Sequence, residues 1–142
     1  MPLALWSLLG FVLWTIGLLL AGVGFPRIRA VKRGESRPSE FRADVPHGSE
    51  RYRRTVRAHL NCVENLPIFA ALVLMASVIG LRSVPFDGLA IAVLPLRLAQ
   101  SITHVISGSS RAVLVRFTFF LLQLACVLAM AGLIAAHALG RS

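Results

Sequence analysis

Charged residues are scarce in this sequence, and acidic residues are the scarcest of them. Only 15% of the 142 residues are charged and only 6 are aspartate or glutamate, whereas 56% are apolar. This composition has too few polar groups for a soluble globule, a soluble nucleotide-binding fold or a disordered chain. Cysteine is rare as well. Cys62 and Cys126 lie in apolar segments, where cysteine packs as a small hydrophobe, so no disulfide framework is expected.

Long apolar runs are what the sequence has instead. Residues 1–26 and 117–140 carry no charge, and each run exceeds the roughly 20 residues that a helix needs to cross a bilayer core about 30 Å thick. The first run lacks the basic n-region of a cleavable signal peptide, so we expect it to be retained. We predict one all-α domain over residues 1–142, an integral membrane four-helix bundle. The spans are expected at about 3–25, 57–81, 87–110 and 114–139, with a basic loop at 27–56.

The net charge of +9 is concentrated between the first two predicted spans. Ten of the 15 lysine and arginine residues fall within residues 27–57, after Pro26 ends the first predicted helix. Basic residues are enriched in cytoplasmic loops, so we expect this loop inside the cell, both termini outside and a bacterial inner membrane as the location. Arg53 and Arg54 are expected to face solvent or lipid headgroups. The loop contains no recognisable nucleic-acid-binding module, so membrane lipid is the expected partner and nucleic acid is not.

Three polar residues share one face of the second predicted span. At about 100° per residue, Arg57, Asn61 and Glu64 project at about 0°, 40° and −20°. A guanidinium clamps a carboxylate, a carboxylate accepts hydrogen bonds from an ammonium group, and an amide both donates and accepts. Together these groups suit a small zwitterionic peptide.

Polar residues also align on the third predicted span and just beyond it. By the same geometry, five of them fall within one quadrant: Arg97, Gln100, His104, Ser107 and Arg111. His104 lies about 10 Å inside Arg111, and Glu64 lies about as far inside Arg57, so His104 and Glu64 are expected at nearly the same depth. The sequence therefore predicts a polar crevice between two helices that opens to the cytoplasm.

Two other interpretations of these stripes remain open at this point. In the first, the polar residues only hold the bundle together: Glu64 neutralises an arginine, Asn61 and Gln100 bridge helices, and no ligand binds. In the second, a metal binds. His59 and His104 are potential ligands, but there is no i,i+4 histidine pair or Cys/His cluster, so we expect no metal.

The segment from Glu50 to Phe69, ERYRRTVRAHLNCVENLPIF, resembles the signature of the membrane-associated proteins in eicosanoid and glutathione metabolism (MAPEG), with the kernel R-A-x-x-N-x-x-E-x-x-P. The chain length, the four spans, the basic first loop and the polar third span extend this resemblance over the whole sequence. It implies a homotrimer of four-helix protomers. It also implies glutathione as cosubstrate, held between neighbouring subunits near the cytoplasmic leaflet.

Taken residue by residue, the resemblance implies roles for four residues of the second predicted span. Arg57 would clamp a glutathione carboxylate, Asn61 would bind an amide, and Glu64 would meet the cysteinyl or γ-glutamyl part. Asn65 completes this glutathione-binding set, at a position that is tyrosine in leukotriene-forming members.

The resemblance on the third span is one of spacing more than identity. Arg97, Gln100 and His104 fall where leukotriene-forming members have an arginine and two tyrosines, which implies that Arg97 and Gln100 bind glutathione. Arg111 falls where those members keep the arginine that stabilises the glutathione thiolate. Because Tyr52 is the only tyrosine, His104 is the expected hydrogen-bond partner or base, and Arg111 and His104 are the expected catalytic residues.

These expectations combine into one leading function and two alternatives. The leading function is a membrane-embedded glutathione-dependent transferase or peroxidase, whose lipophilic electrophile or hydroperoxide enters from the bilayer. The first alternative is a non-catalytic lipid- or glutathione-binding or scaffold protein that has lost its chemistry together with the third-span tyrosines. The second is a small transporter with Glu64 as a proton-coupled carboxylate.

Overall fold

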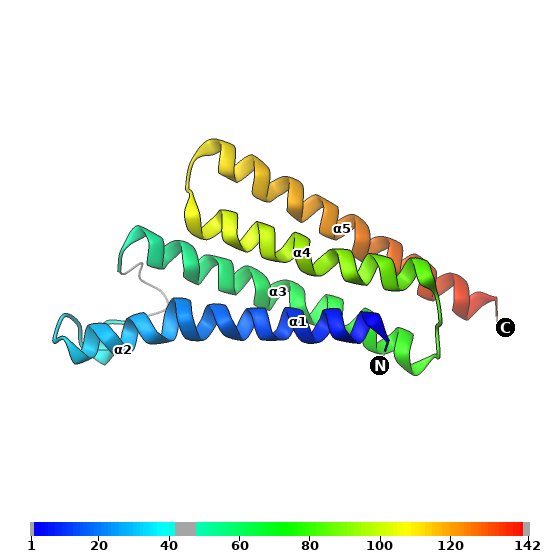
Figure 1. Ribbon diagram of the computed structural model, residues 1–142, viewed down its shortest axis with the longest axis horizontal. Helices are drawn as coiled ribbons and strands as arrows, with labels where there is room; N and C mark the ends of the chain where they lie inside the picture. Colours follow the sequence, from blue (N-terminus) through cyan, green and yellow to red (C-terminus); the bar gives the residue numbers. More distant parts are fainter. Residues whose placement is uncertain (1, 42–47, 141–142) are drawn as a thin grey trace.

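The computed structural model describes residues 2–41 and 48–140, and the regular structure in this part of the chain is helical (Figure 1). The first helix is continuous and has three parts: α1 (Leu3–Gly17), the π-helix η1 (Leu18–Gly24) and α2 (Phe25–Lys32). A short 3₁₀ turn, η2 (Pro38–Glu40), lies in the connector that follows. Three long helices complete the chain: α3 (Glu50–Val78), α4 (Val84–Ile106) and α5 (Ser110–Leu139).

Serine residues cap the last three helices at their N-termini. The hydroxyl oxygens of Ser49, Ser83 and Ser109 each accept a hydrogen bond from a backbone N–H three residues later, at 3.2, 3.3 and 3.3 Å. Each cap satisfies a backbone donor that the first turn of a helix leaves unpaired. After α3, Gly80 has a φ of 68°, the left-handed conformation that glycine adopts readily, and the chain turns into α4.

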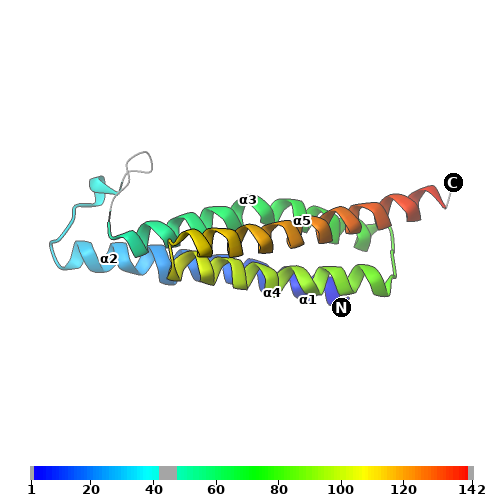
Figure 2. The ribbon, with the colours of Figure 1, turned by 90° about the horizontal axis from the view of Figure 1, so that it is seen from above.

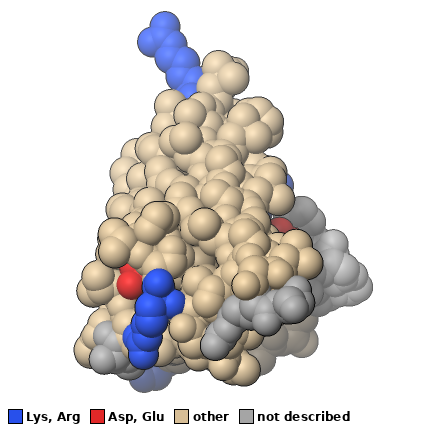
Figure 3. Space-filling model, turned by 90° about the vertical axis from the view of Figure 1, so that its right-hand side faces the viewer, with Lys and Arg blue, Asp and Glu red and all other residues tan. Residues whose placement is uncertain are grey.

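Successive helices run antiparallel, so the molecule has two distinct ends (Figures 1 and 2). One end carries both chain termini and the α3–α4 turn, and the other carries α2 and the α4–α5 turn. Viewed from the first end, most of the surface is neither acidic nor basic (Figure 3). Helix α4 packs against α1, α3 and α5, and therefore lies at the centre of the contacts that hold the bundle together.

The buried core is small and apolar, as expected for a protein whose outer surface faces lipid. The rings of Phe11 and Phe69 meet with their centroids 5.9 Å apart, and Val73, Val93 and Met130 are fully buried around them. Many large apolar side chains on all four helices stay exposed instead. In the part of the chain that the structure describes, four helices are long and apolar enough to cross a membrane. The prediction of an integral, multi-pass four-helix bundle is thus confirmed.

The predicted end of the first helix is wrong. Pro26 does not end it: Pro26 lies at the beginning of α2, directly after the π-helical part, and the helix continues to Lys32. Helix α3 then begins at Glu50, so the predicted loop at 27–56 includes helical residues at both of its ends. Residues 42–47 of that loop lie outside the described residues.

Candidate functional site

The predicted polar stripe on α3 lies along the edge between its buried and exposed faces. Arg57 and Glu64 are exposed in the single chain, and Asn61 is half-buried. Ala58 and Cys62 on the adjoining face are buried against the bundle. The stripe therefore borders a face of α3 that no other described element of the protomer covers.

Asn61 is joined to Arg97 inside the protomer. The Arg97 Nη1 donates a hydrogen bond to the Asn61 Oδ1, and the Arg97 guanidinium carbon lies 5.3 Å from the centroid of the Phe11 ring. Arg97 is only 1% exposed and its Nε has no hydrogen-bond partner among the described residues. This contact links α1, α3 and α4 through a cation that an amide and an aromatic face stabilise.

No carboxylate neutralises Arg97 within the described part of the protomer. The ion pairs found between residues 2–41 and 48–140 involve Glu35 and Glu50 rather than Glu64. Glu64 therefore neutralises no arginine within the described part of the protomer. Asn61, by contrast, bridges α3 and α4, as the structural interpretation expected.

A second buried contact joins α4 to α5. The Gln123 Nε2 donates to the Gln100 Oε1 at 2.9 Å and to the Phe119 carbonyl oxygen at 3.0 Å. Both glutamines are buried, at 7% and 3% exposed for Gln100 and Gln123. Gln100 thus bridges helices as the structural interpretation expected, and sequence reasoning missed Gln123 as its partner.

The predicted catalytic histidine lies among arginines from two other helices. His104 is half-buried on α4 and is close enough for electrostatic interaction with Arg116 on α5 and with Arg57 and Arg54 on α3. Sequence reasoning did not place Arg116 in the site, although a charged residue inside the predicted fourth span was an available signal. Arg54, Arg57 and Arg116 therefore form an arginine cluster near His104, contributed by α3 and α5.

Arg54 is not the solvated side chain that the sequence suggested. Its Nε donates to the Val105 carbonyl oxygen at 3.3 Å, and its Nη1 pairs with Glu50 at 3.2 Å. The side chain of Arg54 is only 25% exposed. Arg54 consequently ties the beginning of α3 to the end of α4, beside His104.

Arg111 belongs to a different helix from the one predicted for its stripe. Helix α4 ends at Ile106, Ser107 is extended with φ −136° and ψ 140°, and Ser109 caps α5. The helical projection that aligned Ser107 and Arg111 with His104 is therefore wrong. Arg111 is exposed in the first turn of α5, on the far side of a tight turn from His104.

The side chain of Asn65 forms a hydrogen bond within its own helix, α3. Its Nδ2 donates to the Asn61 carbonyl oxygen at 2.8 Å. This bond places the side chain of Asn65 along the same edge of α3 as Asn61, where its Oδ1 remains an acceptor.

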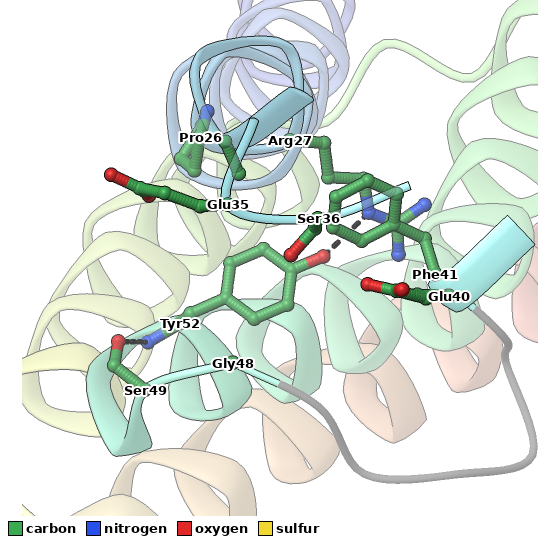
Figure 4. Close-up of a pocket in the computed structure, with 10 residues that line it drawn as sticks. Pro26, Arg27, Glu35, Ser36, Glu40, Phe41, Gly48, Ser49 and Tyr52 are labelled. Carbon is green, nitrogen blue, oxygen red and sulfur yellow. Dashed lines mark hydrogen bonds between the residues drawn. The ribbon is translucent and has the colours of Figure 1, made fainter. Parts of the chain in front are cut away.

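A separate pocket at the same end of the bundle contains none of the predicted site residues. It lies between α2, η2 and the beginning of α3, and the Arg27 Nε donates to the Tyr52 Oη at 2.5 Å across it (Figure 4). The Arg27 guanidinium carbon also lies 5.4 Å from the centroid of the Phe41 ring. Tyr52, the only tyrosine in the sequence, thus joins the beginning of α3 to α2.

Fold and site together define a membrane-embedded four-helix protein with an arginine-rich polar site at one end. The sequence matches the MAPEG family over residues 3–136, which is nearly the whole chain. The protein therefore belongs to the MAPEG family, and the resemblance seen in its sequence is confirmed. A search of curated proteins found no match. Family membership supports a membrane function related to glutathione.

Proposed function

We propose that this protein is a glutathione-dependent transferase or peroxidase that works as a homotrimer in a bacterial inner membrane, with its basic connector in the cytoplasm and both termini outside. The observation that carries this proposal is the cluster of Arg54, Arg57 and Arg116 around the half-buried His104. Arg54 is paired with Glu50, but Arg57 and Arg116 form no ion pair within residues 2–41 and 48–140, and their positive charge favours an anionic ligand at the end of the bundle where a cytosolic peptide can enter.

The exposure of Glu64 supports a site between subunits. Glu64 lies within a span-length helix, and a carboxylate that faces lipid near the bilayer centre costs about 2.5–3.5 kcal/mol on the insertion scale. A neighbouring subunit against this face of α3 would remove Glu64 from lipid and enclose the polar stripe. The homotrimer that the family implies supplies such a neighbour.

Each side chain of the stripe has a role that fits its surroundings. Arg57 clamps a carboxylate of glutathione, and Glu64 accepts from its ammonium group. Because Arg97 occupies the Asn61 Oδ1, the Asn61 Nδ2 is left to donate to a ligand carbonyl, with Asn65 beside it. Arg97 and Gln100 are buried, so we assign them to positioning Asn61 and α5, respectively, and not to direct contact with glutathione.

Arg111 and His104 carry the chemistry in this proposal. The glutathione thiol loses its proton to His104 or to water, and Arg111 stabilises the thiolate. In a transferase reaction the thiolate sulfur forms a bond to the electrophilic carbon while the leaving group departs. In a peroxidase reaction the thiolate attacks the peroxide oxygen and the O–O bond breaks. The leaving alkoxide takes up the proton that the thiol released and departs as the alcohol, and a second glutathione converts the sulfenic acid into glutathione disulfide and water.

Turnover of a model aryl halide with glutathione by the purified, detergent-solubilised protein tests the proposal. We expect Arg111→Gln to lower kcat by about 100-fold, the effect typical of losing one preorganised charge-stabilising group. Arg82→Gln is the matched control, because Arg82 is an exposed arginine in the α3–α4 turn at the opposite end. An Arg111→Gln rate equal to that of the control would refute the assigned mechanism.

One observation favours a second candidate, a non-catalytic glutathione- or lipid-binding or scaffold protein. The only tyrosine, Tyr52, is bonded to Arg27 in the connector pocket, so α4 offers no phenol to a bound thiol. Glutathione that raises the melting temperature of the protein without any turnover would establish this candidate.

A further inference from the structure

A groove runs along the first helix where it passes α3, away from the polar stripe. It encloses about 690 Å³ and is lined mainly by the α1–η1 segment on one side and by the beginning of α3 on the other, with Val105 of α4 at its edge. Arg57, Asn61, Glu64 and Arg111 do not line it. The groove is therefore separate from the site of the proposed function.

The lining changes from basic to apolar along the groove. Arg29 on α2 and Arg51 on α3 line it at the charged end of the bundle, whereas Trp14, Leu18 and Ala21 line it towards the middle of the membrane span. Both arginines are exposed, and neither forms an ion pair within residues 2–41 and 48–140. Two cations above an apolar channel match an anionic headgroup above a hydrocarbon chain.

Small residues on the first helix create this space. At Gly22 the first helix touches α3, and a side chain there would clash with the Thr55 methyl group. At Gly17, by contrast, an added Cβ would meet no atom within 4 Å. The helix is a π-helix from Leu18 to Gly24, which changes the face that successive residues present. The two helices therefore touch near Thr55 and leave an open channel beside Gly17.

The length of the channel suits a lipid chain. Trp14 and Pro26 both line it, and at about 1.5 Å per residue they lie about 18 Å apart along the helix. One leaflet of the hydrocarbon core is about 15 Å thick. A single acyl chain can thus follow the groove from the headgroup level to the middle of the bilayer.

We infer that this groove binds an anionic phospholipid, with Arg29 and Arg51 on its phosphate and one acyl chain along Trp14, Gly17 and Ala21. The arginines donate paired hydrogen bonds to the phosphate oxygens, and the chain fills a channel that the protomer itself leaves open. The inference goes beyond the proposed function, because it requires neither glutathione nor the α3 stripe.

Delipidated protein in detergent provides the test. Native mass spectrometry and thermal unfolding are measured with three probes: dioleoylphosphatidylglycerol, dioleoylphosphatidylcholine and glycerol 3-phosphate. We expect phosphatidylglycerol to bind at least about tenfold more tightly than phosphatidylcholine, which has the same chains without net negative charge. Glycerol 3-phosphate, which lacks the chains, should not shift the melting temperature.

Two variants separate the headgroup contact from the channel. Arg29→Gln with Arg51→Gln should abolish the preference for phosphatidylglycerol, whereas Arg33→Gln with Arg53→Gln removes equal charge outside the groove and should retain it. Gly17→Leu should fill the channel and weaken binding of both lipids. Gly132→Leu is its control, because Gly132 on α5 has equally open space and lies outside the groove.

Three results would overturn the inference. The first is equal binding of the two lipids to the unmodified protein. The second is a control variant that loses as much binding as its groove counterpart. The third is a Gly17→Leu protein whose oligomer dissociates in size-exclusion chromatography, because that would assign the groove to another copy of the chain. Loss of glutathione turnover alone bears on the proposed function and leaves these lipid measurements unaffected.

Discussion

The C-terminal half of α4 places polar side chains in two different surroundings. Arg97 and Gln100 are buried, and each is hydrogen-bonded to a side chain on a neighbouring helix. His104, nearer the end of the helix, is half-buried, and the charged groups that interact with it are arginines from α3 and α5. One helix thus carries residues that hold the bundle together and a partly exposed residue that we propose to be catalytic. Four predictions test this division, from the largest expected effect to the smallest.

Arg97→Ala should have the largest effect on stability. The change leaves a cavity beside Phe11 and an unpaired Asn61 Oδ1, so we expect the free energy of unfolding to fall by about 3 kcal/mol. Denaturant unfolding in detergent micelles measures this. Arg111→Ala is the control and should change stability by less than about 0.5 kcal/mol. Equal effects of the two substitutions would contradict the distinction between buried residues that stabilise the bundle and exposed residues that do not.

Gln123→Leu should lower the free energy of unfolding by a smaller amount, about 2 kcal/mol, because the Gln100 Oε1 then remains buried without a donor. The double variant Gln100→Leu with Gln123→Leu removes both partners and should recover most of that loss. A double-mutant cycle on unfolding free energies gives the coupling directly. Additive losses would mean that this hydrogen bond does not join α4 to α5.

Arg57→Gln should change ligand binding and leave stability alone. Arg57 is exposed and belongs to the accessible group, so we expect the KM for glutathione to rise about tenfold, the equivalent of about 1.4 kcal/mol, with an unchanged melting temperature. Arg53→Gln, four residues earlier on the same helix and outside the cluster around His104, serves as the control. A lower melting temperature with an unchanged KM would move Arg57 into the structural group.

Ser109→Ala should have the smallest effect, a loss of about 1 kcal/mol from the cap of α5. The cap also sets where Arg111 lies, so kcat should fall as well. Ser83→Ala removes the equivalent cap of α4 at the opposite end, and we expect it to cost similar stability without a change in kcat. If the two variants have the same kcat, the cap of α5 does not position Arg111.

Several features of the site could be predicted from the sequence because they depend on local periodicity. The α-helical repeat places Arg57, Asn61 and Glu64 along one edge of a single helix, whatever packs against it. The same reasoning failed for Arg111, because it extended a helical repeat through a turn. A serine cap and an extended Ser107 separate α4 from α5 there.

The sequence by itself determined the class of protein: long apolar runs require membrane helices, because a bilayer core offers no water to unpaired backbone groups, and the α3 signature indicates the family. Only the tertiary structure decided which polar groups meet. That Arg97 bonds Asn61 over Phe11, and that Arg54 and Arg116 join His104, depends on the rotation and packing of whole helices. A helical repeat defines the face that a residue occupies but carries no information about the partner helix.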